Sequence, residues 1–226
     1  VLIKRKGSDY HDKSITYNKE HSSATALRKY LSLHSELKEL ESSLMPSSIE
    51  IIKKSKPLFA DDFRGSISRK LYDLLYNDVD LSIYSDISPN LSDRIYRLNK
   101  NYSDYEAMVA SIKSKDYTFT RISRALCHIL LNIKKSDTDI YKNNIKYSKL
   151  LGFRRSSGNL LKLIKTRSKL INITKPADAK DILRDEKETY RLFMSEVYAS
   201  YIYNSVYYDK YKTELKNSYS REIVIV

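Results

Sequence analysis

The sequence is poor in the residues that build disulfide-bonded, turn-rich or membrane-spanning proteins. Its 226 residues include no tryptophan, one cysteine, four glycines and four prolines. A single cysteine cannot form an internal disulfide, and no apolar run approaches the roughly 18–20 residues that cross a bilayer. The opening residues also lack the pattern of a signal peptide. These absences exclude a disulfide scaffold and predict a cytoplasmic protein that does not span a membrane.

Few side chains are suited to nucleophilic or metal chemistry. Cys127 lies within an apolar helical pattern, so we interpret it as a core thiol rather than a nucleophile. None of the four histidines lies at metal-ligand spacing from cysteines or carboxylates, which predicts no structural metal. They are His11, His21, His34 and His128.

Positive charge is the strongest compositional signal. Lysine and arginine number 41 against 28 aspartates and glutamates, a formal net charge of +13. This surplus favours a polyanionic partner, either nucleic acid or an anionic membrane surface, and of the two we expect nucleic acid and no membrane partner. Twenty tyrosines add side chains that can stack on bases. An AT-rich genome also favours Lys, Tyr, Asn, Ile and Ser codons, so composition alone leaves RNA binding open.

The pattern of residues predicts a mainly helical fold. Glycine and proline are scarce, and Leu, Lys, Glu and Ile are abundant. Helices are expected at about 23–33, 35–44, 47–55, 61–76, 91–100, 103–115, 118–133, 156–168 and 186–208, with a loop at 80–90. Strands are expected at 1–5, 146–153, 170–174 and 223–226. The order strand, helix, strand between 146 and 174 predicts a small βαβ element.

The first residues carry two further expectations. The strand at Val1–Arg5 has nothing before it to pair with, and a lone strand is not stable. We therefore expect the chain to be a truncation. The stretch Ser22–Arg28 places small hydroxyl residues at a helix start, where backbone N–H groups bind anions and Arg28 can reach the same anion. The alternative is a serine N-cap followed by a surface arginine.

One helical segment combines an apolar stripe with a basic ridge. Arg121, Arg124, His128 and Lys135 follow one another at steps of 3, 4 and 7, which places them on one face of a helix. Few acids offset the two arginines locally, so we interpret this face as a phosphate-binding ridge. An ordinary solvated charged face is the alternative.

A second helix repeats this arrangement. Lys162, Lys165 and Lys169 lie opposite Leu160 and Ile164. The same two interpretations apply: either the lysines bind phosphates or they form a solvated face. We predict that they bind RNA together with the first ridge. Sequence would then be read from exposed bases rather than from phosphates.

Several short motifs occur in a specific order. They are Lys4-Arg5-Lys6-Gly7, Tyr10-His11-Asp12, Ser23-Ala24-Thr25-Ala26-Leu27-Arg28, Asp116-Tyr117-Thr118-Phe119-Thr120-Arg121-Ile122-Ser123-Arg124 with His128, Leu151-Gly152-Phe153, Gly158 with Leu160 and Leu161, and Ile173-Thr174-Lys175. In order and spacing this set resembles the bacterial tRNA(Met) cytidine acetate ligase family. The resemblance spans nearly the whole chain, although each motif is short.

The resemblance implies an activity for the full-length protein. The family uses ATP to activate acetate as acetyl-adenylate, and then acetylates N4 of the wobble cytidine of elongator tRNA(Met). It implies Mg-bound ATP as co-substrate, with acetate and tRNA as partners. The residues it places near ATP are Ser23, Thr25, Leu27 and Arg28, together with Arg5. Leu27 stands where isoleucine is commoner. His11 and Asp12 form either a catalytic pair or a loop-ordering contact.

One family motif is missing from this sequence. No His-x-Gly-His loop, which holds ATP in the family, is present. We therefore expect the chain alone to be inactive and to hold no cofactor. Residues 1–33 would be a remnant of an α/β nucleotidyltransferase domain, and 34–226 a mainly helical tRNA-binding domain. The alternatives are a non-enzymatic basic RNA- or DNA-binding module and a structural protein-interaction domain.

Overall fold

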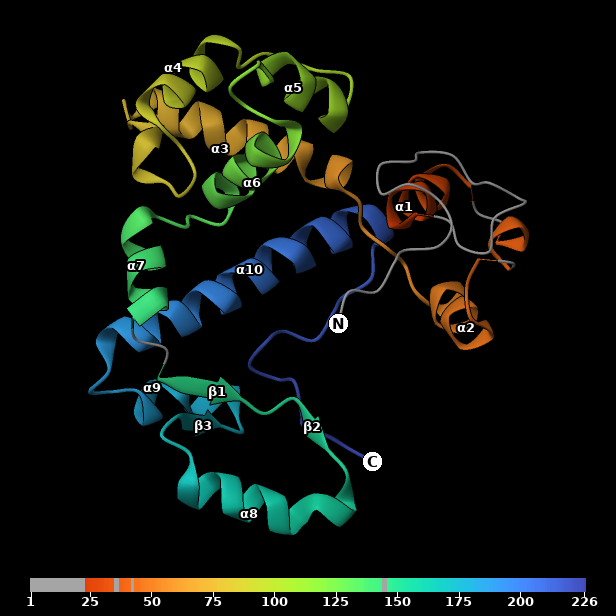
Figure 1. The fold of residues 1–226 in the computed structure, drawn as a ribbon, viewed down its shortest axis with the longest axis vertical. Helices are drawn as coiled ribbons and strands as arrows, with labels where there is room; N and C mark the ends of the chain where they lie inside the picture. The colour runs from red at the N-terminus through yellow and green to blue at the C-terminus, as the bar shows by residue number, and fades with distance from the viewer. Residues whose placement is uncertain (1–22, 35–36, 42, 144–145) are drawn as a thin grey trace, which may run out of the picture. The chain divides into compact units, whose positions relative to one another are not determined.

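The computed structural model describes residues 23–34, 37–41, 43–143 and 146–226. The chain divides into two compact units, Val1–Phe59 and Ala60–Val226, which are described separately (Figure 1). The strand expected at the start, Arg5 and the His11-Asp12 pair lie outside the described residues. The predicted boundary at residue 33, between a remnant of a nucleotidyltransferase domain and a helical tRNA-binding domain, stays a prediction.

The first unit contains two short helices. Helix α1 (Ala24–Leu33) is capped by Ser23, and α2 (Pro46–Lys54) begins at a proline, whose fixed φ suits the first helical turn. The helix expected over 35–44 is wrong. The described residues there form only the 3₁₀ turn η1 (Lys38–Leu40), which buries Leu40. Before Pro46, Met45 is extended, as the residue preceding a proline prefers, so no helix continues into α2.

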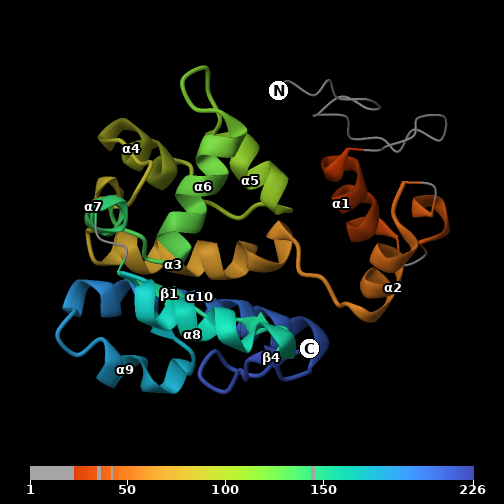
Figure 2. The same cartoon turned by 60° about the horizontal axis from the view of Figure 1, so that its bottom comes forward.

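The second unit opens with a layer of helices around a large apolar core. Its elements are η2 (Ala60–Phe63), α3 (Arg64–Tyr76), η3 (Leu81–Ile83), α4 (Pro89–Arg97), α5 (Tyr105–Ile112) and α6 (Phe119–Leu130). Helix α6 packs against α3 and α5, as Figures 1 and 2 both show. The buried side chains at their contact include Ile67, Leu71, Met108, Ile112, Ile122, Leu126 and Ile129.

Helix α6 follows the sequence prediction closely at its start. The Thr118 hydroxyl accepts a hydrogen bond from the Arg121 N–H at 3.3 Å, a normal N-cap. The helix ends at Leu130, three residues earlier than expected, because Asn132 adopts a left-handed φ of 56°. A helix absent from the prediction, α7 (Lys135–Asn143), begins after this turn.

The predicted βαβ element is present in the second unit. Strands β1 (Tyr147–Lys149) and β3 (Ile171–Ile173) pair in parallel, and α8 (Gly158–Arg167) lies between them in the sequence. The single strand expected over 146–153 is wrong, because its second part is a separate strand.

That separate strand, β2 (Gly152–Phe153), pairs with the chain's last residues. Its partner is β4 (Val224–Ile225), which confirms the predicted strand in the tail. A Cβ at Gly152 would lie 2.7 Å from the Val224 carbonyl oxygen, so only glycine permits this approach. The strand therefore divides at the point where the backbone leaves one partner for another.

A long helix joins the two apolar clusters of the second unit. After the short α9 (Ala179–Ile182), α10 (Lys187–Tyr211) packs Ile202 against the first cluster. Phe193 and Val197, on the same helix, form a second cluster with Ile173 and other residues.

The mainly helical fold with a small βαβ element is therefore confirmed for the described residues. None of the described helices has the length and apolar character needed to cross a membrane.

Candidate nucleic-acid interface

The start of α1 has the serine cap that the sequence left open as an alternative. The Ser23 hydroxyl accepts from the Ala26 N–H at 3.0 Å and is fully buried. Arg28 is exposed, and the partly exposed Thr25 lies one helical turn before it on the same face. Leu27, between them, is partly exposed. Whether this helix start also holds the phosphates of ATP stays a prediction.

Two basic residues of the predicted ridge on α6 lie close to the same carboxylate. The Arg124 Nε donates to Asp86 Oδ2 at 2.9 Å, and His128 Nδ1 lies 3.7 Å from the same oxygen. His128 Nδ1 is also 3.0 Å from the Ser85 carbonyl oxygen. Few acids lie near Arg124 in the sequence, as expected, but a carboxylate that is distant in the sequence offsets its charge. Asp86 could not be identified as this partner from the sequence because it is far from Arg124 along the chain. It lies in a loop and has a left-handed φ of 65°.

The other two members of the ridge differ from Arg124. The Arg121 guanidinium lies 5.1 Å from the centroid of the Tyr117 ring, a cation–π distance, and makes no ion pair with a described residue. Lys135 was predicted on the same helix face, which is wrong because α6 ends at Leu130 and Lys135 opens α7. The four residues of the predicted ridge are therefore divided between two helices, α6 and α7, and do not share one helix face.

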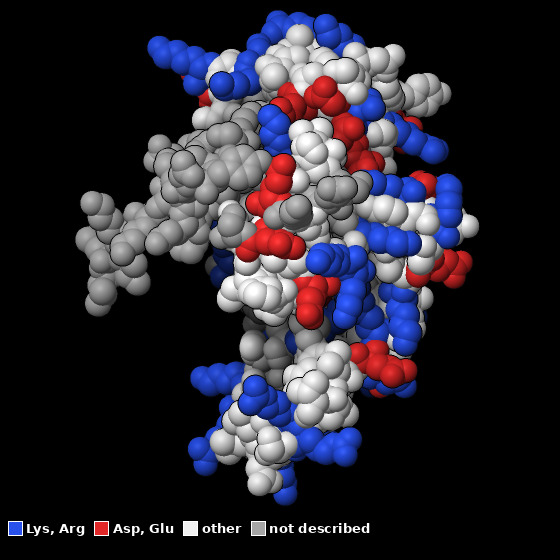
Figure 3. Space-filling view, turned by 90° about the vertical axis from the view of Figure 1, so that its right-hand side faces the viewer, with Lys and Arg blue, Asp and Glu red and all other residues white. Residues whose placement is uncertain are grey.

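Two of the three predicted lysines, Lys162 and Lys165, lie on α8, whereas Lys169 lies beyond the end of the helix at Arg167, so its placement on the helix was wrong. All three are exposed, and none makes an ion pair with any described residue. The opposite side is also open, with Leu160 55% and Ile164 41% exposed. In Figure 3, lysines and arginines project around the lower end of the molecule, the region of α8 in Figure 1.

A longer basic segment surrounds these lysines and was missed from the sequence. Between Asp139 and Asp178 the chain contains no acidic residue. The basic residues of this segment are Lys142, Lys146, Lys149, Arg154, Arg155, Lys162, Lys165, Arg167, Lys169 and Lys175. The signal that could have found it is the absence of acids, which a search for helical spacing does not register.

A cavity of about 940 Å³ lies between the α6–α7 turn, β1 and α10. It lies within the second unit, and two of the predicted RNA-contacting residues, His128 and Lys135, line it. Its other lining residues are Ser85, Asp86, Leu131, Ile133, Asp137, Thr138, Asp139, Tyr141, Lys142, Tyr147, Ser148, Lys149, Leu192, Ser195, Glu196 and Ala199. The fold thus brings together residues that the sequence placed on one helix and residues that it did not single out.

Most of the acids in this cavity already have partners. Asp137 forms an ion pair with Arg191 on α10, and Asp86 pairs with Arg124. Glu196 accepts a hydrogen bond from the Tyr147 hydroxyl at 2.6 Å. Burial, and then this acceptor carboxylate, raise the pKa of Tyr147, so the phenol keeps its proton at neutral pH. The cavity therefore carries less uncompensated negative charge than its number of carboxylates indicates.

Cys127 is not the buried core thiol that the sequence predicted. Its side chain is exposed, although the protein around it raises the pKa of the thiol. A raised pKa disfavours the thiolate and so weakens Cys127 as a nucleophile. Among the residues that the structure describes, no group of three His, Cys, Asp or Glu side chains is arranged to hold a metal ion.

The sequence matches the family model described as HIGH Nucleotidyl Transferase over residues 1–218. The chain belongs to the HIGH nucleotidyl transferase family. Since the match begins at residue 1, it gives no support to the expectation that most of the nucleotidyltransferase domain is missing.

Two relatives of this HIGH nucleotidyl transferase chain carry a more specific name. The tRNA(Met) cytidine acetate ligase of Clostridium kluyveri is 35% identical over 81% of this chain and 46% of its own length. That of Thermoanaerobacter sp. strain X514 is 32% identical over 91% of this chain and 49% of its own. The chain thus spans about half the length of these curated relatives.

Solved structures of similar fold include Thermotoga maritima TmcAL. The apo form superposes with a TM-score of 0.84 and 20% identity, covering 99% of this chain and 55% of that one. The form bound with alpha-thio ATP superposes with a TM-score of 0.79 and 19% identity, covering 91% of this chain and 52% of that one. At this identity the likeness shows that the HIGH nucleotidyl transferase chain shares the fold, and nothing finer.

Proposed function

We propose that this chain is the tRNA-binding part of an ATP-dependent ligase that acetylates N4 of the wobble cytidine of elongator tRNA(Met). The observation that carries the RNA side of this proposal is the acid-free segment between Asp139 and Asp178, whose lysines on α8 have no acidic partner among the described residues. The names of the relatives supply the substrate. Residues 34–226 would form the tRNA-binding domain.

The cations on α8 and just after its end, which have no described acidic partner, suit the phosphate backbone of RNA. A lysine that neutralises a phosphate releases a condensed counterion, and this release drives binding at low salt. Lys162, Lys165 and Lys169 meet this condition because no described acid competes for them. Arg121 and Lys135 are assigned the same role. Arg124 and His128 are assigned a smaller contribution, because Asp86 already engages them.

The ATP side of the proposal rests on the resemblance. Ser23, Thr25, Leu27 and Arg28 at the start of α1, with Arg5, are assigned to the phosphates. Thr25 and the exposed Arg28 share a face at a helix N-terminus of suitable polarity for an anion, so the donor set fits a triphosphate. ATP supplies the adenylyl group that activates acetate. Without a His-x-Gly-His motif, the chain alone is expected not to form acetyl-adenylate.

The test is binding of the chain to elongator tRNA(Met) over a range of salt concentrations. Changing Lys162, Lys165 and Lys169 together to Gln removes three phosphate contacts, so the slope of log K against log salt should fall by about 2 to 3. The affinity at low salt should then drop roughly ten- to thousandfold. A matched control removes the same charge elsewhere, at the exposed Lys53, Lys54 and Lys115.

An equal loss in the control set would contradict docking through α8, because it would mean that only total charge matters. A second function, a non-enzymatic basic RNA-binding module, is favoured by the missing His-x-Gly-His motif. Competition with initiator tRNA separates the two. A ligase part that reads its substrate prefers the elongator, whereas a general module binds both tRNAs equally.

A further inference from the structure

We propose that the 940 Å³ cavity beside α7 receives one unstacked base of the docked RNA, and that Tyr141 stacks on it. The inference rests on the proposed function and adds a binding site to it. Bases that leave the stack are held in proteins by aromatic faces and by hydrogen bonds along their edges. The cavity offers both kinds of surface next to free cations.

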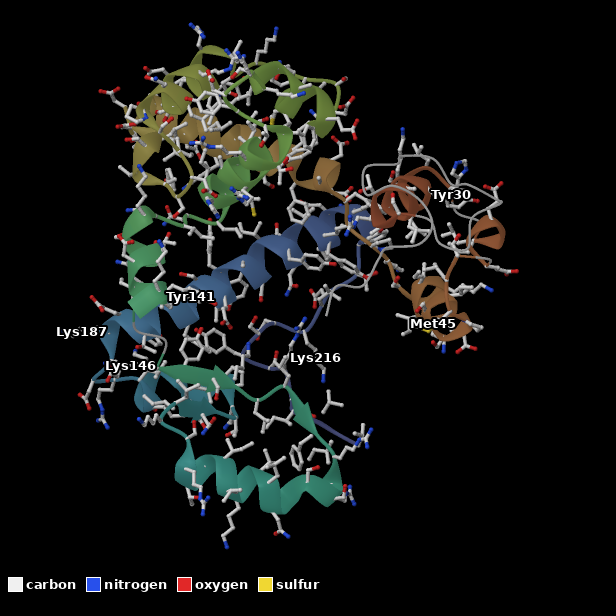
Figure 4. The ribbon with its side chains drawn as sticks, viewed as in Figure 1. Tyr30, Met45, Tyr141, Lys146, Lys187 and Lys216 are labelled. Atoms are coloured by element: carbon white, nitrogen blue, oxygen red, sulfur yellow. The ribbon has the colours of Figure 1, made fainter. Side chains whose placement is uncertain are left out.

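Tyr141 has the position and exposure that stacking requires. It lines the cavity from α7, and 59% of its surface is exposed, so its ring is available to a ligand. In Figure 4 it projects from the end of α7 that lies nearest Lys146. The cavity wall also includes the apolar side chains of Leu131, Ile133 and Leu192, which suit the face of a base.

The charges around the cavity suit a nucleotide rather than a cation. Asp86 and Asp137 pair with Arg124 and Arg191, and Glu196 lies 3.9 Å from the Lys149 Nζ, so their charges are largely offset. In contrast, Lys135 and Lys142 line the cavity from α7 and pair with no described acid. A phosphate on either side of an inserted base can lie on these lysines.

One carboxylate in the cavity has no cation partner among the described residues. Asp139 is exposed on α7, within the same lining as Tyr141. A carboxylate can only accept hydrogen bonds when ionised, and the exocyclic amino groups of bases are donors. Asp139 therefore suits a base that turns an N–H donor, such as an exocyclic amino group, toward this position.

The cavity also continues the surface assigned to RNA. His128 belongs to the basic ridge on α6, and Lys149 belongs to the acid-free segment that leads to α8. The acid-free segment therefore links the lining of the cavity to α8 along the chain. An acidic peptide offers the same charge but no flat base, and the experiment separates the two.

The absence of tryptophan makes a direct test possible. In the 226-residue chain, Tyr141→Trp introduces the single indole, and stacking on a base should quench its fluorescence at one tRNA per chain. In parallel, Tyr141→Ala should weaken tRNA binding about 5- to 150-fold, the effect of losing one stacked base, with the salt slope unchanged. Tyr141→Phe should bind as the parent does.

Two further variants complete the test. Tyr76→Ala removes another tyrosine, 89% exposed on α3, and should leave affinity unchanged. Lys142→Gln should lower the salt slope by about 1, the signature of a phosphate contact. If the chain binds tRNA but Tyr141→Ala changes nothing, or the indole stays unquenched at saturation, the base site is overturned while docking stands. If the parent chain binds no tRNA at low salt, both proposals fall. Quenching by an acidic peptide but not by RNA would also overturn the base site.

Discussion

Helices α6 and α8 have similar patterns of apolar and basic residues, but α6 is packed into the core whereas α8 is exposed. Each combines an apolar stripe with basic residues one turn apart. In α6 the stripe is buried, with Ile122 and Leu126 fully covered, and Arg124 is paired with Asp86. In α8 no residue is buried, and Lys162 and Lys165 have no described acidic partner. Formal charge is therefore a poor guide to the charge that a ligand can use.

The difference has a physical consequence for binding. A cation already held by a carboxylate must leave it to reach a phosphate, so the net gain is small. An unpaired lysine has only counterions to release. The helix with the weaker packing thus provides the stronger electrostatic surface, whereas the well-packed helix provides stability.

The largest expected difference between the two helices is in stability. Leu126→Ala should lower the free energy of unfolding by about 2–5 kcal/mol, because it leaves a cavity in the buried core. Leu160→Ala, at a residue that is 55% exposed, should change it by less than about 0.5 kcal/mol. Urea unfolding followed by circular dichroism measures both.

Equal losses in the two variants would mean that α8 is covered in solution. In that case the comparison fails, since the exposed stripe of α8 would have a partner that buries it. Leu163→Ala, at a third exposed position on α8, serves as a repeat of the same measurement.

The second expected difference concerns the salt dependence of tRNA binding. Lys165→Gln should lower the slope of log K against log salt by about 1, since it removes one phosphate contact. Arg124→Gln should lower the slope by clearly less than this, because Asp86 already engages this cation. Filter binding at several salt concentrations resolves the two. A larger change for Arg124→Gln would place the main docking surface on α6.

The sequence predicted local features well and long-range ones poorly. The apolar spacing of Ile122, Leu126 and Ile129 identified α6 because a buried stripe is a local property of a helix. The division of strand 146–153 was missed because it depends on pairing between Gly152 and Val224, far apart in the chain. A register between distant strands leaves no signal in either segment alone.

The site shows the same limit. The lysines of α8 could be identified from spacing and the surplus of charge. The partnership of Arg124 with Asp86 could not, because it joins residues 38 positions apart. The cavity was also hidden from the sequence, since its lining comes from α7 and α10 as well as from the end of α6. Cys127 shows the converse error, since helical spacing suggested burial for a residue that lies at the edge of the stripe.

A smaller effect is expected from releasing Arg124. Asp86→Asn removes the carboxylate but keeps a residue that tolerates the left-handed φ of 65°. Unfolding stability should fall by no more than about 1 kcal/mol, the value of an exposed ion pair. The salt slope of tRNA binding should rise by up to about 1, because the freed guanidinium becomes available to phosphate.

The double variant provides the control for this prediction. In the Asp86→Asn background, Arg124→Gln should return the slope to its original value. If Asp86→Asn raises the slope and Arg124→Gln does not reverse it, the gain does not come from the Arg124 guanidinium.

The smallest expected effect uses the single cysteine as a reporter on α6. Cys127 lies next to His128 and one turn from Arg124, and the protein around it raises the pKa of its thiol. Alkylation by iodoacetamide at pH 8 should therefore be slower than that of a free cysteine, and should level off only at a higher pH, because only the thiolate reacts. If tRNA docks mainly through α8, saturating tRNA should leave the alkylation rate unchanged. Strong protection of Cys127 would instead show that RNA covers α6, and the contrast between the two helices would have to be reversed.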